Sequence, residues 1–214
     1  MEAREVAAIV GGDTSVLTRF DAQEKRAKSG ILKDARYVLF ATHGFLGTDF
    51  LQNIDLTLDA EGVVARSGTP NKGALAQPAL AMTLTGDLGG EDGLLSMKEV
   101  IEDLELSAEL VVLSACNTAG DSASSSNGEG FAGLTRSFMY AGAKALVVSH
   151  WSVDSVATQA LVTGIFTELK AGRAPNEALA LAQKALVATT YQSEGRSFSR
   201  AHPFFWAPFV VVGD

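Results

Sequence analysis

Hydrophobic residues follow two patterns along this chain, which together predict strands alternating with helices. Four short, almost unbroken apolar runs contain β-branched or aromatic residues, which is typical of strands buried on both faces of a parallel sheet. These runs are Tyr37–Thr42, Leu110–Ala115, Ala145–Ser149 and Phe209–Val212. The alternation in Ala79–Thr85 predicts a further strand, in a hairpin at the sheet edge, and Ser15–Thr18 is compatible with a short one.

Helical patterns lie between the predicted strands. Ser96 and Glu99 have the spacing of a capping box, which predicts a helix running to about Asp103. Further helices are expected at Ala3–Val10, Asp21–Ile31, Phe131–Tyr140, Ser155–Lys170 and Pro175–Thr189, several of them ended by a glycine. Strands alternating with helices predict an α/β fold, with a mainly parallel sheet covered by helices on both faces.

Composition narrows the class of protein. With 214 residues, 47% of them hydrophobic, the chain is long enough for one α/β domain with a sizeable core. The formal charge is −8, and the lysines and arginines are scattered, which argues against a nucleic-acid-binding surface. No apolar run reaches the roughly 18 residues of a membrane span. A charged N-terminus without a signal-peptide core, together with a single cysteine, leads us to expect a cytoplasmic protein.

The sequence motifs do not favour a metal or a bound cofactor. One cysteine and three widely separated histidines lack the spacing of a zinc site. The glycine-rich segment Gly86–Gly93 is acidic, so it would repel a phosphate group. The long polar stretch Gly47–Gln77 is either a functional loop or a flexible insertion.

Two residues at strand ends are candidates for chemistry. His43 follows the first predicted strand and precedes Gly44, and Cys116 ends the second and precedes a loop rich in glycine and serine. Open α/β sheets bind their ligands beyond the carboxyl ends of the strands. A cysteine is more commonly a small core residue, but a strand-end position beside such a loop fits that role poorly. From spacing alone, catalysis and packing remain open alternatives.

Five segments resemble the CHAT domain family, which comprises bacterial and archaeal relatives of caspases and separase that are often fused to tetratricopeptide repeats. They are Tyr37–Gly44, Leu110–Gly120, Gly128–Ala143, Ala145–Asp154 and His202–Asp214. The resemblance runs from about Glu2 to the last residue and implies a caspase-like three-layer sandwich forming a single domain over residues 1–214. Family members usually carry at least one more strand upstream, so we expect either an excised domain or a shorter sheet.

The resemblance also implies an activity and a site. It places the family's catalytic dyad on His43 and on Cys116 of the S-A-C-N-T motif, which implies a cysteine endopeptidase acting through a thioester. The backbone N–H groups of Gly44 and Cys116 are the implied oxyanion donors. Glycine suits that position because the absence of a Cβ lets the substrate approach closely.

The implied substrate pocket lies after the third predicted strand. Trp151 and Asp154 are expected to border the cleft, and Asp154 would accept a basic substrate residue with help from Asp121 or Glu129. Alternatively, Asp154 only caps the helix that begins near Ser155, a role that aspartate favours. Trp151 is equally compatible with packing in the core or in the wall of the pocket.

The other two histidines are expected to be structural. His150 stands where the family usually has leucine, and we expect it to be a partly buried packing residue. His202 begins a stretch that is structural in the family.

Three functions remain open for this chain. The first is an endopeptidase that acts on protein or peptide substrates and is regulated by tetratricopeptide-repeat or other domains, without nucleic acid or membrane partners. The second is a catalytically silent interaction module on a caspase-like fold. The third is a thiol hydrolase acting on small molecules, with Gly47–Gln77 as a lid.

Overall fold

A six-stranded sheet forms the centre of the described part of the chain. The structure, a computed structural model, describes residues 2–45, 78–84, 87–116, 128–151, 154–193 and 196–213. The strand order is β3-β2-β1-β4-β5-β8. The bounds are β1 Tyr37–Phe45, β2 Ala79–Ala81, β3 Leu94–Ser96, β4 Leu110–Cys116, β5 Ala145–Ser149 and β8 Phe209–Gly213. The segment Gly47–Gln77 lies outside the described residues.

The sheet is mixed, with a parallel centre. Strands β1, β4 and β5 run parallel to one another. On one side, β2 pairs antiparallel with β1 and β3 pairs antiparallel with β2, while β8 pairs antiparallel with β5 on the other side. Four of the six strands (β1, β3, β4 and β5) therefore point the same way, in agreement with the prediction of a mostly parallel sheet.

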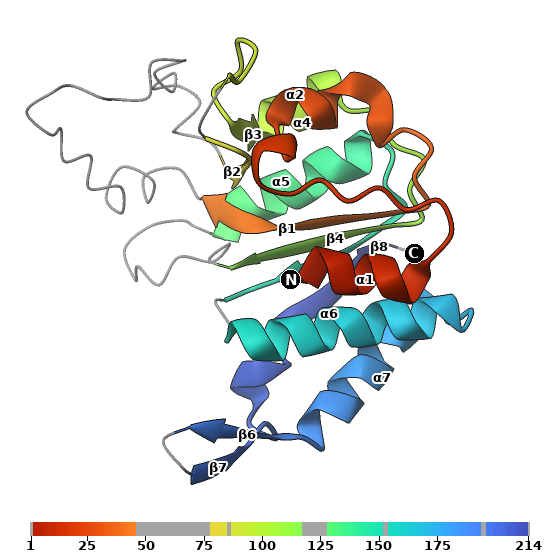
Figure 1. The fold of residues 1–214 in the computed structure, drawn as a ribbon, viewed down its shortest axis with the longest axis vertical. Helices are drawn as coiled ribbons and strands as arrows, with labels where there is room; N and C mark the ends of the chain where they lie inside the picture. The colour runs from red at the N-terminus through yellow and green to blue at the C-terminus, as the bar shows by residue number, and fades with distance from the viewer. Residues whose placement is uncertain are drawn as a thin grey trace, which may run out of the picture.

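Helices cover both faces of this sheet, as Figure 1 shows. One face carries α2 (Glu24–Arg26), the π-helical turn Ala27–Ile31, α4 (Met97–Asp103) and α5 (Gly128–Tyr140). The opposite face carries α1 (Glu2–Val10), α6 (Ser155–Lys170) and α7 (Pro175–Val187). The result is the helix–sheet–helix layering that the alternation of strands and helices predicted.

The unbroken apolar runs of β4 and β5 are explained by burial on both faces, whereas β8, at the edge of the sheet, is buried only at Phe209. In β4, Val111 and Leu113 belong to the core beneath α4 and α5, whereas Leu110 and Val112 belong to the core beneath α1, α6 and α7. All four side chains are fully buried. Side chains of a strand alternate between its faces, so a strand with two covered faces needs apolar residues at every position.

Some sequence-based expectations about these elements were wrong or incomplete. Residues 15–18 form no strand, and the expected helix over Asp21–Ile31 is broken, because Gly30 has a φ of +83° inside the π-helical turn. Strand β1 extends three residues beyond Thr42, because β2 pairs with its last two residues. The expected strand at Ala79–Thr85 ends already at Ala81.

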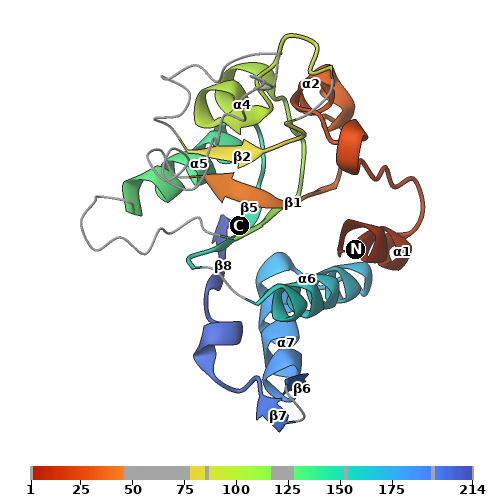
Figure 2. The same ribbon diagram turned by 60° about the vertical axis from the view of Figure 1, so that its left-hand side comes forward.

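The described residues also contain elements that the sequence pattern did not predict. Strand β3 is one, and the separate two-stranded sheet of β6 (Thr190–Ser193) and β7 (Arg196–Ser199) is another. Figure 2 shows this small hairpin beyond α7, away from the main sheet. A short 3₁₀ turn, η4 (Pro203–Phe205), then leads into β8.

Candidate active site

His43 and Cys116 are neighbours across two adjacent strands. They are the last of seven paired positions between the parallel strands β1 and β4, a ladder that begins at Tyr37 and Leu110. Adjacent strands lie about 4.8 Å apart. The backbones of His43 and Cys116 are therefore close enough for the two side chains to interact. The His43 side chain is exposed, whereas for Cys116 only the backbone is described.

The alternation of buried residues sets this register. Sliding β4 by one residue against β1 would transfer Val112 and Leu113 to the opposite core. Because both faces of the sheet are filled with close-packed side chains, such a slip is strongly disfavoured. The pairing of His43 with Cys116 therefore follows from packing along the whole length of the two strands.

Gly44 lies inside the sheet and not in an open turn after β1. It is buried, and its Cα partner is Leu80 on β2. The Thr42 hydroxyl donates a hydrogen bond to the carbonyl of Ala81, which ties β2 to the end of β1. The end of β1 is therefore held between β4 on one side and β2 on the other.

The strand-end motifs and the pairing of His43 with Cys116 agree with a comparison of the chain with known protein families. The CHAT domain model matches residues 1–214, which is the whole chain. The chain belongs to the CHAT domain family. The CHAT domain is peptidase-like and related to caspases, so the family expected from the sequence motifs is confirmed.

Two curated proteins are similar to part of this CHAT domain. Tetratricopeptide repeat protein 28 of Mus musculus is 32% identical over 112 residues, 52% of this chain and 4% of that protein. Tetratricopeptide repeat protein 28 of Homo sapiens is 32% identical over 121 residues, 56% of this chain and 4% of that protein. The chain therefore matches only a small part of the length of these relatives.

Trp151 and Asp154 both make structural contacts in the CHAT domain. The Trp151 side chain is half-buried, packs against the core beneath α6, and donates through Nε1 to the Phe204 carbonyl at 3.2 Å. Asp154 is exposed and is the N-cap of α6, because its Oδ1 accepts a hydrogen bond from the Ala157 N–H at 2.9 Å. The alternative that Asp154 caps the helix beginning near Ser155 is thus confirmed. Its role in substrate binding stays a prediction.

The structure describes some, but not all, of the other residues that the sequence analysis singled out. Glu129 lies in the first turn of α5, with only its backbone described, and Asp121 lies outside the described residues. His150 is exposed, which corrects the expectation that it is partly buried, since it follows the end of β5. His202 is structural as expected, because its Nδ1 accepts a hydrogen bond from the Phe204 N–H at 3.2 Å.

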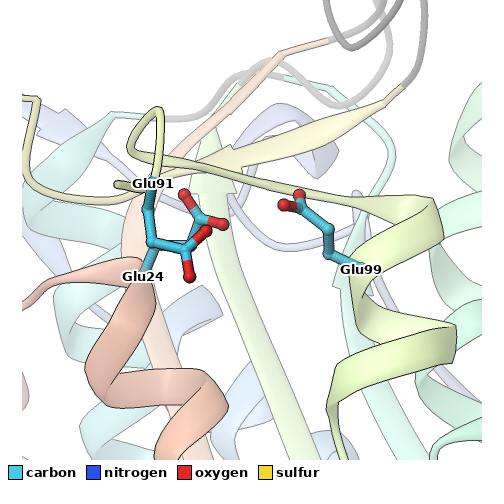
Figure 3. Close-up of side chains that lie close together, drawn as sticks. All are labelled: Glu24, Glu91 and Glu99. Carbon is cyan, nitrogen blue, oxygen red and sulfur yellow. The ribbon is translucent and has the colours of Figure 1, made fainter. Parts of the chain in front are cut away.

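A cluster of carboxylates that sequence reasoning missed lies at the N-terminal end of α4. Figure 3 shows Glu24, Glu91 and Glu99 close together, and their ligand atoms lie within 4.8 Å of one another. Lys28 Nζ lies 2.9 Å from Glu91 Oε2 and 2.7 Å from Glu99 Oε1, and it also contacts Glu24. The lysine ammonium thus stands where these carboxylates would hold a metal ion.

The sequence contains local signs of this cluster but not the cluster itself. Glu24 and Lys28 have i,i+4 spacing, and Glu99 belongs to the predicted capping box. Their contact joins segments separated by 71 residues, counted from Lys28 to Glu99, and no local pattern encodes such a contact.

Burial and ion pairing shift the pKa values of two of these carboxyl groups in opposite directions. Burial raises the pKa of Glu24 to about 8, despite its contact with Lys28, and a hydrogen bond with Glu99 adds to the rise. Burial alone would also raise the pKa of Glu99, but hydrogen bonds from Lys28 and Ser96 lower it to about 2. At neutral pH Glu24 is therefore largely protonated beside an ionised Glu99.

None of the described helices is long and apolar enough to cross a membrane.

Proposed function

We propose that this CHAT domain is a cysteine endopeptidase with His43 and Cys116 as its catalytic dyad. The observation that supports the proposal most strongly is the pairing of these two residues at the carboxyl ends of the adjacent parallel strands β1 and β4. A histidine beside a cysteine is the arrangement needed to form a thiolate near neutral pH. A peptidase-like family is consistent with that chemistry.

The proposed reaction has two halves. The Cys116 thiol transfers its proton to the His43 imidazole, and the thiolate attacks the carbonyl carbon of the scissile peptide bond. The imidazolium then protonates the leaving nitrogen as the C–N bond breaks, leaving a thioester. In the second half His43 takes a proton from water, the hydroxide attacks the thioester, and the protonated thiol leaves as the carboxylic product forms.

The backbone N–H groups of Gly44 and Cys116 are the proposed donors to the oxyanion. Removing one such donor typically lowers the rate by about 10²–10³. Gly44 pairs with Leu80 of β2 and directly follows His43, the last residue of β1 that pairs with β4. The sheet would therefore hold the Gly44 backbone rigidly, and rigid donors stabilise developing charge best.

For substrate binding we propose a basic residue before the scissile bond. Trp151 would form part of the wall, and Asp154 would receive the positive charge with help from Asp121 or Glu129. The Asp154 carboxylate is exposed, and its Oδ1 serves the helix cap. We propose that the other carboxylate oxygen of Asp154 contacts the positive charge of the substrate.

Regulation by tetratricopeptide-repeat domains is part of the proposal. Both curated relatives are named as tetratricopeptide repeat proteins, and the matched region is 4% of each. We therefore propose that residues 1–214 act as a single catalytic domain that works together with repeat domains.

The dyad can be tested directly because Cys116 is the only cysteine of the chain. The rate of alkylation by iodoacetamide, measured against pH, then reports this thiol alone. We expect His43→Gln to slow alkylation at pH 7 at least tenfold, because the thiol then approaches its ordinary pKa of about 8.5. Cys116→Ala should abolish both labelling and cleavage of a peptide library.

His202→Asn is the matched control, since it removes a histidine but keeps a side-chain acceptor for the turn. Its alkylation profile should match the wild type. Equal labelling in the wild type and His43→Gln would overturn the dyad. A wild type with a reactive thiol that cleaves no peptide, with or without added repeat domains, would favour the interaction module instead. Cleavage of small amides only would favour the thiol hydrolase.

A further inference from the structure

Glu24, in the cluster around Lys28, has a second partner besides the lysine. Its Oε1 contacts Lys28, whereas its Oε2 accepts a hydrogen bond from the Gly93 N–H at 2.9 Å. Figure 3 shows the side chain extending from the start of α2. The residue is only 1% exposed, and glutamates are rarely buried to this extent. An apolar side chain would fill this space without the free energy needed to bury a polar group, so the bond to Gly93 calls for an explanation.

This bond ends the pairing between β2 and β3. Met82 directly follows β2 and Gly93 directly precedes β3, and the Met82 N–H donates to the Gly93 carbonyl at 2.8 Å. In a regular antiparallel pair the Gly93 N–H would donate in return to the Met82 carbonyl. Gly93 has a φ of +83° and donates to Glu24 instead. The Glu24 carboxyl group therefore takes the place of a strand neighbour and fixes where the ladder ends.

The residues just before Glu24 hold the other chain segment of this hairpin. The Thr83 N–H donates to the Ala22 carbonyl at 2.9 Å, and the Thr83 hydroxyl donates to the same carbonyl at 3.0 Å. Gln23 Nε2 donates to the Asp87 carbonyl at 3.0 Å. Residues 22–24 thus form a clamp that binds the chain both after β2 and before β3.

Strands β2 and β3 in turn hold the end of β1. Each has only three residues, and so short a hairpin has little stability of its own. Strand β2 pairs with Gly44 and Phe45, and the Ala81 carbonyl accepts a hydrogen bond from the Thr42 hydroxyl. His43 therefore lies between two residues of β1 that are attached to β2.

We propose that Glu24 is a positioning residue for the end of β1, which deepens the proposed function and rests on it. Its bond to Gly93 fixes β3 and β2, and β2 fixes Gly44 relative to Cys116. Groups that stabilise a transition state must be held within about 0.5 Å of their productive position. A loosened clamp therefore weakens the stabilisation of the oxyanion by the Gly44 N–H.

Two reactions of the same thiol separate this effect from the reactivity of Cys116 itself. In acylation by p-nitrophenyl acetate, the thiolate attacks the ester carbonyl, an oxyanion forms, and p-nitrophenolate leaves as the thioester is made. In alkylation by iodoacetamide, the thiolate displaces iodide in one step, and no oxyanion forms. The ratio of the two rates therefore reports the oxyanion donors.

The test is Glu24→Leu in the full chain, well below its melting temperature, with Cys116→Ala giving the background. We expect acylation to slow about tenfold, less than the 10²–10³ typical of losing a donor outright, while alkylation stays within about twofold. Glu24→Gln keeps an oxygen for the Gly93 N–H and should restore acylation. Glu91→Leu is the matched control, because it also removes a carboxylate from Lys28, and it should leave both rates unchanged.

The outcomes separate the role of Glu24 from the dyad. If Glu24→Leu slows neither reaction, or both equally, the role of Glu24 is wrong while the dyad stands. Acylation as slow in Glu24→Gln as in Glu24→Leu would overturn the role of the bond to Gly93. A wild type acylated no faster than Cys116→Ala would instead overturn the proposed function.

Thr42→Val decides the question if Glu24→Leu does not fold. It removes only the hydroxyl that binds the Ala81 carbonyl, and so loosens the end of β1 from β2. We expect acylation of this variant to slow about threefold, since one neutral hydrogen bond contributes about 0.5–1.5 kcal/mol, with alkylation unchanged. Wild-type rates in both reactions would show that β2 does not position Gly44 and would overturn the proposal.

Discussion

At the scale of single residues, Gly142 shows how closely the backbone constrains this fold. The sequence pattern predicted that a helix ends before it, and α5 ends at Tyr140. Gly142 has a φ of +112°, and a Cβ placed there would lie 2.0 Å from the carbonyl oxygen of Leu106. Glycine is thus needed both for its backbone conformation and for the close approach of another segment.

Gly142→Ala should therefore reduce the free energy of unfolding by about 2–4 kcal/mol, from backbone strain plus displacement of a neighbouring backbone. Gly172→Ala is the matched control. Gly172 also has a positive φ, of +86°, but no atom lies within 4 Å of the position that a Cβ would take there, so strain alone predicts a loss of about 1 kcal/mol. Urea unfolding measures both. Equal losses in the two variants would show that the contact with Leu106 does not matter.

At the scale of elements, the sequence predicted best where burial produces a regular pattern. Helix α6 and strand β5 have the predicted bounds, and the strands that bring His43 and Cys116 together were recognised as almost unbroken apolar runs. Strand β3 has only three residues, which is too short for an alternating hydrophobic pattern. Strand β7 is exposed along its whole length, so burial imposes no such pattern on it. Their pairing depends on contacts between distant segments, and so does the pairing that lengthens β1.

The capping box of α4 gives a prediction at the same scale. Ser96 Oγ accepts a hydrogen bond from the Glu99 N–H at 3.3 Å, and Glu99 Oε2 accepts one from the Ser96 N–H at 2.9 Å. Ser96→Ala removes the first bond together with the one that Ser96 Oγ donates to Glu99 Oε2 at 2.6 Å, and should lower the free energy of unfolding by about 1 kcal/mol. Ser107→Ala, at an exposed position outside the helices, should change it by less than about 0.5 kcal/mol. Guanidinium unfolding of both variants distinguishes a cap from the loss of any hydroxyl.

At the scale of the whole molecule, ion pairs join two segments that are distant in the sequence. Lys33 pairs with Glu105 at 3.0 Å and Arg36 with Glu109 at 2.7 Å, both on the surface. Exposed pairs of this kind contribute little, typically below about 1 kcal/mol. The Lys28 cluster differs because the Glu24 side chain is only 1% exposed. It joins α2 to the loop before β3 and to α4, so its protonation state affects how these elements are held together.

This cluster predicts that stability falls on both sides of a middle pH range. The native pKa of Glu24, about 8, lies above its ordinary value of 4.5, so the native state holds a proton that the unfolded chain releases. Stability therefore declines as pH rises from about 4.5 through 8. The pKa of Glu99 is lowered to about 2, so its contribution is present above 4.5 and is lost as pH falls toward 2.

Glu24→Gln isolates the alkaline side of this prediction. A glutamine imitates the protonated carboxyl, with an oxygen for the Gly93 N–H, now 2.9 Å from Glu24 Oε2, and a donor for Glu99. The melting temperature of the wild type should therefore fall between pH 6 and pH 9 more steeply than that of Glu24→Gln. The exposed Glu102→Gln is the control and should follow the wild type. Parallel curves for all three proteins would mean that Glu24 is ionised in the native state at neutral pH, with Lys28 neutralising it.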